Sequence, residues 1–87
     1  MNRGERERQY FLAALERLEH AKPSRRLLVA MDNALEHLQK FLVRVLDARA
    51  RGVGGLGYWC TEAETLIAHL KSERQKMADR VRREELN

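Results

Sequence analysis

The sequence has few of the residues that add covalent stability to a small protein. Its 87 residues include one cysteine, Cys60, so no disulfide can form within the chain. We expect Cys60 to be a small buried hydrophobe, because free cysteine is among the most buried residue types. A chain this short has one modest core and a thin stability margin, which small proteins commonly offset by self-association.

Long apolar runs are also absent. The run from Leu27 to Met31, for example, spans five residues, whereas a membrane-spanning helix needs about twenty. The first residues carry mixed charges and no apolar stretch follows them, so we expect no signal peptide. The 17 Lys and Arg residues exceed the 13 Asp and Glu residues only mildly, giving a net charge of +4. This balance fits a solvated helical surface as well as an anionic partner. We therefore expect a cytoplasmic protein and no membrane partner.

Helix-breaking residues are scarce and fall in two places. The one proline is Pro23, and four of the five glycines lie in residues 52–57. Proline ends a preceding helix because it lacks an amide donor. The sequence therefore predicts a single helical domain over residues 1–87, all-α, with a long central helix. Its three helices span about residues 5–21, 24–51 and 61–84, and residues 52–60 form a glycine-rich loop between the second and third.

Several residues are placed to end or begin these helices. Ser24 stands at the N-cap of the second helix, and Gly52 follows its last turn, where glycine is common. Thr61 and Glu64 have the T-x-x-E spacing of a capping box. We therefore expect the third helix to open at Thr61.

The second predicted helix has the strongest apolar pattern. Its apolar residues recur at alternating spacings of three and four residues, which form the seam of a heptad repeat. These residues are Leu28, Met31, Leu35, Leu38, Leu42 and Val45. A flanking row at intervals of seven contains Leu27, Ala34, Phe41 and Ala48. Such a band is wider than one antiparallel neighbour covers. We therefore expect this helix to organise the fold and to form an oligomeric helical bundle, with a homodimer favoured. The predicted interface with a second copy or a protein partner consists of Leu35, Leu38, Phe41, Leu42 and Val45.

The third predicted helix changes character along its length. An apolar stripe of Ala63, Leu66, Ile67 and Leu70 gives way to a charged end, residues 74–87, that we expect to fray when alone. Possible anion contacts there are Arg74, Lys76, Arg80, Arg82 and Arg83. A basic helix of this kind gains affinity for nucleic acid by neutralising phosphates, so a nucleic-acid-binding regulator is an alternative function. The simpler interpretation is a solvated face with charge pairs four residues apart.

No motif indicates catalysis, a cofactor or a metal. Nucleophilic catalysis needs a Ser, Cys or Thr paired with a positioned base, and Ser24 and Thr61 are better explained as helix caps. The three histidines are scattered, whereas zinc takes three or four convergent ligands. Residues 52–57 match G-x-G-x-x-G, but a helix precedes them where a dinucleotide fold has a strand. Beside this loop, Tyr58 and Trp59 either pack on the helix ends or form an exposed contact surface.

Residues 23–36 resemble the hairpin of phage proteins that sequester cyclic-nucleotide immune signals. In that family P-P-S-R-E precedes a helix rich in Ala, Leu and Glu, and here Pro23-Ser24-Arg25 precedes a helix that contains Ala30, Met31 and Glu36. The chain departs from the pattern at Arg26, where the family has Glu, and it lacks the family's later Trp. The resemblance implies a helical oligomer that binds an anionic nucleotide through Arg25 or Arg26, with Tyr10 stacked on a base.

The function that these features favour is binding rather than catalysis. We expect a small non-enzymatic regulator or inhibitor that binds a protein through a helical apolar surface. By analogy of composition, it is of the type that phages, plasmids and bacterial regulatory circuits encode.

Overall fold

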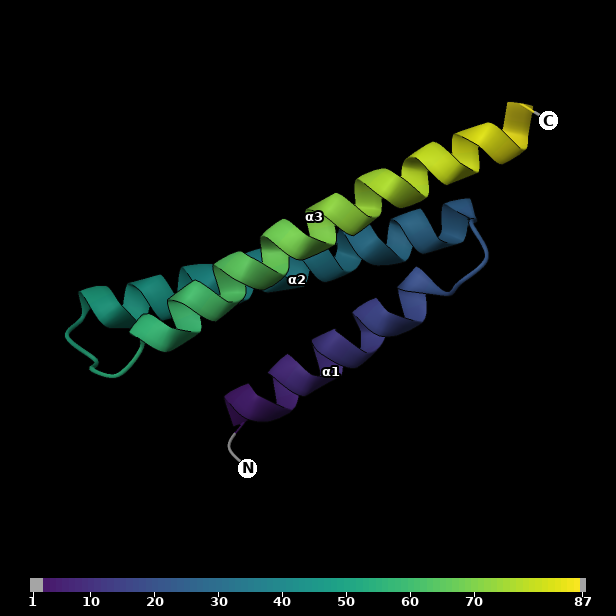
Figure 1. Cartoon of the computed structure of the whole chain (residues 1–87). Helices are drawn as coiled ribbons and strands as arrows, with labels where there is room; N and C mark the ends of the chain where they lie inside the picture. The colour runs from purple at the N-terminus through teal and green to yellow at the C-terminus, as the bar shows by residue number, and fades with distance from the viewer. Residues whose placement is uncertain (1–2, 87) are drawn as a thin grey trace.

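The computed structural model describes residues 3–86, and these residues form three α-helices and no strand (Figure 1). The helices are α1 (Arg3–Glu19), α2 (Arg25–Ala50) and α3 (Gly57–Leu86). This confirms the all-α, three-helix prediction. Within the described residues, no helix combines the length and the apolar composition that a membrane span requires.

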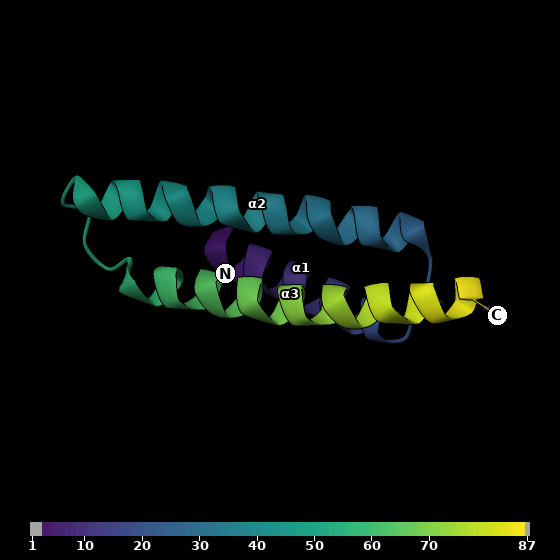
Figure 2. The ribbon, with the colours of Figure 1, turned by 90° about the horizontal axis from the view of Figure 1, so that it is seen from above.

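α2 and α3 form an antiparallel hairpin, and α1 runs beside it in the direction of α3 (Figures 1 and 2). Ion pairs across the hairpin fix its register: Arg74 on α3 bonds Asp32 on α2 at 2.8 Å. The backbone of α1 approaches α3 more closely than it approaches α2. The chain is therefore a long two-helix hairpin with a shorter third helix laid along it.

The core depends mainly on α3, which corrects our expectation that α2 organises the fold. α3 has 30 residues against 26 in α2, and it contacts both other helices. α2 buries Met31, Leu38 and Val45, whereas α3 buries Cys60, Ala63, Leu66, Ile67, Leu70, Met77 and Val81. α1 adds Phe11 and Leu15. The reason is geometric, because α3 packs against two helices while the flanking row of α2 faces a helix that lies further away.

The charged end of α3 has more core contact than its sequence suggests. Met77 and Val81 are 3% and 7% exposed, and the helix continues to Leu86. These two residues lie four apart on one face of α3. They are buried because this end of α3 lies beside the start of α2 (Figure 1). Fraying of this segment in solution remains a prediction.

Both ends of α2 are capped as the sequence predicts. At its start, the Ser24 hydroxyl accepts a hydrogen bond from the Leu27 amide at 3.2 Å. At its end, the Gly52 amide donates to the Arg49 carbonyl at 3.0 Å, and the Val53 amide donates to the Ala48 carbonyl at 3.1 Å. This pair of bonds is the Schellman motif. The motif needs the left-handed backbone of Gly52, whose φ is +93°.

The start of α3 differs from the prediction. The helix begins at Gly57, four residues before Thr61. In its first turn, the Cys60 amide donates a hydrogen bond to the Leu56 carbonyl at 3.1 Å. Thr61 is not a cap, because its hydroxyl donates back to the Gly57 carbonyl at 3.2 Å. Cys60 and Ala63 are 6% and 2% exposed. Burial of these residues stabilises an extra turn, and this outweighs the local capping preference.

We expect Gly52→Ala to lower the free energy of unfolding by about 1 kcal/mol, because an alanine side chain disfavours a positive φ. Gly54→Ala is the matched control, since Gly54 lies in the same loop without a positive φ, and a methyl group there meets nothing within 4 Å. Urea unfolding followed by circular dichroism measures both. Equal losses in the two variants would show that the left-handed turn does not limit stability.

Candidate protein-binding groove at the open end of the hairpin

α1 leaves one end of the α2–α3 hairpin uncovered. Figures 1 and 2 both show α2, the glycine loop and the start of α3 extending beyond the first residues of α1. The hairpin is long, and the molecule measures 54 Å along its main axis against 24 and 16 Å across. We call the uncovered part, residues 41–60, the open end.

A groove of about 400 Å³ lies at the open end, and we call it the open-end groove. Apolar side chains form much of its lining, namely Phe41, Val45, Ala48, Leu56 and Trp59. Polar side chains stand around them, namely Glu7, His37, Lys40 and Arg44. The groove thus joins α2, the loop and α3 with the start of α1, and it has an apolar floor and a mainly cationic rim on the α2 side.

The open-end groove continues between α1 and α2. A second hollow of about 670 Å³ lies there, and it shares Glu7 and His37 with the first. Its wall includes Phe11, whose ring lies 5.7 Å from that of His37. Tyr10 stands at its rim and is 71% exposed. The two hollows together follow one flank of α2 over several turns.

The flanking row recognised in the sequence of α2 lines this surface. Ala34 lines the hollow beside α1, and Phe41 and Ala48 line the open-end groove. These residues stand at intervals of seven, so they lie along one face of the helix. The band on α2 is therefore divided: the heptad seam and the first half of the flanking row, Leu27 and Ala34, pack against the chain's own core, whereas Phe41 and Ala48 line the open-end groove.

The structure separates the residues of the predicted interface. Leu38 and Val45 are 2% and 9% exposed within the chain, so the chain itself covers nearly all of both side chains, although Val45 also lines the open-end groove. Leu35 and Leu42 are partly buried and pack against the core. Phe41 is the member of the predicted set that combines partial exposure with a position in the groove floor. The physical reason is that α3 covers the seam, which leaves only its flank open.

The two aromatic residues after the loop take different positions. Trp59 is half-buried in the groove, while Tyr58 is 51% exposed, and their rings meet edge to face at 4.9 Å. The alternatives left open by the sequence are thus both realised, one by each residue. Trp59 is also the chain's one tryptophan, so its fluorescence reports on the groove.

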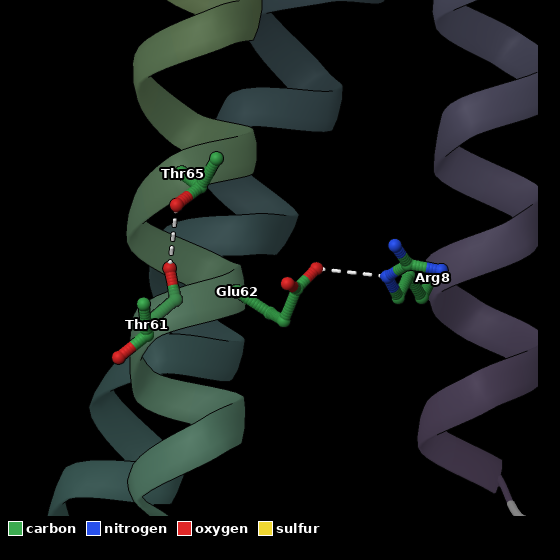
Figure 3. A network of polar contacts seen from close by, with 4 residues as sticks. All are labelled: Arg8, Thr61, Glu62 and Thr65. Carbon is green, nitrogen blue, oxygen red and sulfur yellow. Dashed lines mark hydrogen bonds and ion pairs between the residues drawn. The ribbon is translucent and has the colours of Figure 1, made fainter.

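An ion pair holds the start of α1 against α3 beside the groove. The Arg8 Nε donates to Glu62 at 2.8 Å, and the exposed fractions of the two side chains are 35% and 25% (Figure 3). The hydrogen bond to Glu62 and the charge of that carboxylate raise the pKa of Arg8. Figure 3 also shows Thr61 and Thr65 on the same stretch of α3, where the Thr65 hydroxyl donates to the Thr61 carbonyl at 2.9 Å. Arg8 thus fixes the position at which α1 begins to cover the hairpin.

The predicted anion contacts on α3 are largely paired with carboxylates of the same chain. Arg74 bonds Asp32 at 2.8 Å, which raises the pKa of Arg74, mainly through the hydrogen bond. Lys76 pairs with Glu73 at 3.2 Å, and Arg82 pairs with Asp79 at 3.0 Å. Arg80 and Arg83 form no ion pair among the described residues. This arrangement is the solvated face with local charge pairs rather than a row of free cations.

The residues implied by the nucleotide-sequestering resemblance do not line one site. Arg25 forms a two-pronged ion pair with Glu85, whose second contact, from Nη2 to Oε2, is 2.8 Å. Tyr10 instead stands at the rim of the hollow between α1 and α2, whose lining does not include Arg25 or Arg26. Arg25 closes the end of the hairpin opposite the glycine loop.

One group of metal-ligand side chains converges in the described residues, although the sequence predicts none. Ligand atoms of Glu19, His69 and Glu73 all lie within 4.8 Å of one another. Glu19 is 50 residues from His69 in the sequence, so only the packing of α1 against α3 brings them together. This cluster lies at the far end of α1 from the open-end groove.

The ion pair between Arg25 and Glu85 predicts a pH dependence. The hydrogen bond from Arg25 lowers the pKa of Glu85. A carboxyl whose pKa is lower in the folded state stabilises the fold above its unfolded pKa and loses this contribution as the pH falls through the folded pKa. We expect Arg25→Gln to raise the pKa of Glu85 in an NMR titration and to reduce stability at pH 7 more than below about pH 4. Arg26→Gln is the control, since Arg26 is exposed and forms no ion pair with the described residues 3–86; an equal effect there would contradict this assignment.

Comparison with known proteins adds no relative, because no protein-family model, no curated protein and no solved structure matches this chain.

Proposed function

We propose that this chain is a non-enzymatic regulator or inhibitor that binds a protein partner by receiving one amphipathic helix of that partner in the open-end groove. The observation that carries the proposal is an apolar groove whose floor follows a heptad-spaced row of α2. Grooves of this kind bind the apolar face of a helix through anchors three and four residues apart.

The dimensions of the open end support a short helix. The α2 residues that line the groove run from His37 to Ala48, a rise of about 17 Å at 1.5 Å per residue. This length matches about three turns of an incoming helix. Phe41 and Trp59 offer the large apolar contacts that dominate such interfaces. The incoming helix would lie over the open end and reach Glu7 and His37, beside the first turns of α1.

The charges around the groove favour an acidic partner helix. Lys40 and Arg44 stand on the α2 side, and Arg44 forms no ion pair among the described residues. Lys40 pairs with Glu36 at 3.1 Å, and Glu7 lies on the α1 side. With a net charge of +4, the chain attracts an acidic partner and repels a second copy of itself at long range. Carboxylates flanking the apolar face of the helix would complement the rim.

A second copy of the chain is the competing occupant of the same groove. The homodimer predicted from the sequence places α2 at the interface, and Phe41 is common to both arrangements. In a symmetric pair, however, the same cationic rim would meet itself. Light scattering separates the two: a partner-free chain of 10.2 kDa is expected to be monomeric at micromolar concentrations, and a stable dimer lost in Phe41→Glu would favour self-association instead.

Selection of peptides that bind the chain tests which kind of helix the open-end groove receives. From a displayed library of acidic, basic and neutral helical peptides, we expect the wild type to enrich amphipathic helices with acidic flanks. Binding should shift the emission of Trp59 to shorter wavelength, because the partner removes its ring from water. Enrichment of basic or non-helical peptides, or binding without a change in Trp59 emission, would contradict the proposal.

Two pairs of variants locate the binding surface. Phe41→Glu should abolish binding of the selected peptide, whereas Val43→Glu should keep it, because Val43 is 65% exposed and does not line the groove. Arg44→Glu should weaken binding by about tenfold or more, with a strong dependence on salt. Arg49→Glu, an exposed position on α2 outside the groove, should change binding little. Both arginine side chains are on the surface, so neither arginine variant is expected to unfold the chain, and weaker binding in Arg44→Glu would reflect the lost contact.

A further inference from the structure

We propose that Glu19, His69 and Glu73 form a binding site for a divalent transition-metal ion of the zinc class, which would link the end of α1 to α3. The site is separate from the open-end groove and does not depend on the proposed function. It rests on the convergence of three metal-ligand side chains from two helices, with all ligand atoms within 4.8 Å of one another.

The spacing and mobility of the side chains suit a bound ion. His69 and Glu73 stand four residues apart on α3, so their side chains share one face. Ligands around a zinc ion lie about 3.4 Å apart when each is about 2.1 Å from the metal. Glu19 and His69 are 45% and 49% exposed, so small rotations of these side chains bring the ligand atoms to that spacing. The fourth position would be held by water.

Within the cluster, Glu73 forms an ion pair with Lys76 at 3.2 Å, whereas the charge of Glu19 is less well compensated. Glu19 and Glu73 are two carboxylates in the same small space. The His69 Nε2 lies 3.9 Å from Glu19, beyond hydrogen-bond length. Glu19 is also the last residue of α1, where the carbonyl end of the helix disfavours a negative charge. A divalent ion would offset both effects.

Two cationic side chains lie nearby and would compete with a metal ion for the carboxylates. Lys76 Nζ is 3.2 Å from one oxygen of Glu73, and Arg80 lines the adjoining hollow of about 280 Å³ together with Glu19 and Glu73. A metal would use the second oxygen of Glu73 or displace Lys76. Binding is therefore weaker than at a buried four-ligand site. The donor set selects the metal class, because imidazole nitrogen favours zinc and similar ions over calcium or magnesium, which prefer six or more oxygens.

The test uses zinc chloride and the full chain at pH 7 in a buffer that does not chelate metals. Isothermal titration should show one zinc ion per chain, and zinc should raise the melting temperature because the ion binds only the folded arrangement. His69→Ala and Glu19→Gln should each weaken binding by about tenfold or more and abolish the shift in melting temperature. Calcium chloride should give no comparable heat.

A matched pair of residues at the end of α1 provides the control. Glu16 on α1 and His20, which directly follows the helix, have the same chemistry at the same spacing of four residues, but they are not part of the convergent cluster. Glu16→Gln and His20→Ala should leave zinc binding unchanged. Absence of saturable zinc binding, binding that survives His69→Ala, or equal loss in the control variants would overturn the proposal. Because the mutated side chains are exposed, circular dichroism should confirm that each variant folds.

Discussion

The packing of α3 along α2 is the interaction on which the other features depend. It buries the heptad seam of α2 against the longest apolar stripe of the chain, and ion pairs such as that of Arg74 with Asp32 keep its register. α1 then packs on a surface that the hairpin has already formed. Because α3 covers the seam rather than the flank of α2, Phe41 and Ala48 on that flank line a groove at the open end. The groove, its aromatic anchors and the position of α1 all follow from this division.

Much of the fold is encoded locally and could be predicted from the sequence. Pro23 and the glycines of residues 52–57 mark the places where the helices are interrupted. Ser24 and Gly52 cap α2 through hydrogen bonds to residues close in the sequence. The start of α3 could not be predicted in the same way, because two signals compete there. The spacing of Thr61 and Glu64 favours a helix from Thr61, but tertiary burial of Cys60 and Ala63 extends it to Gly57. Local patterns do not show how much a residue gains from a distant helix.

The candidate sites depend on long-range packing, so the sequence indicated them only in part. The width of the apolar band on α2 predicts that one neighbour does not cover it, and in the structure Phe41 and Ala48 of this band line a groove. Which residues stay open depends on where α3 and α1 lie, and this explains why Leu38 falls in the core while Phe41 faces the groove. The cluster at Glu19 shows the same limit more strongly. His69 and Glu73 are recognisable as neighbours on one helix, but no periodicity relates them to a residue on α1.

The short connection between α1 and α2 has a consequence for which helices the groove can admit. Residues 20–24 tether α1 next to the flank of α2, so its effective concentration there is of millimolar order. Under the proposed function, a partner helix confined to the open end would meet no competitor. A longer one would have to displace the first turns of α1 from the same flank, against this concentration and against the bond from Arg8 to Glu62. α1 would then limit the length of the helix that binds, and partners would be discriminated by size as well as by charge.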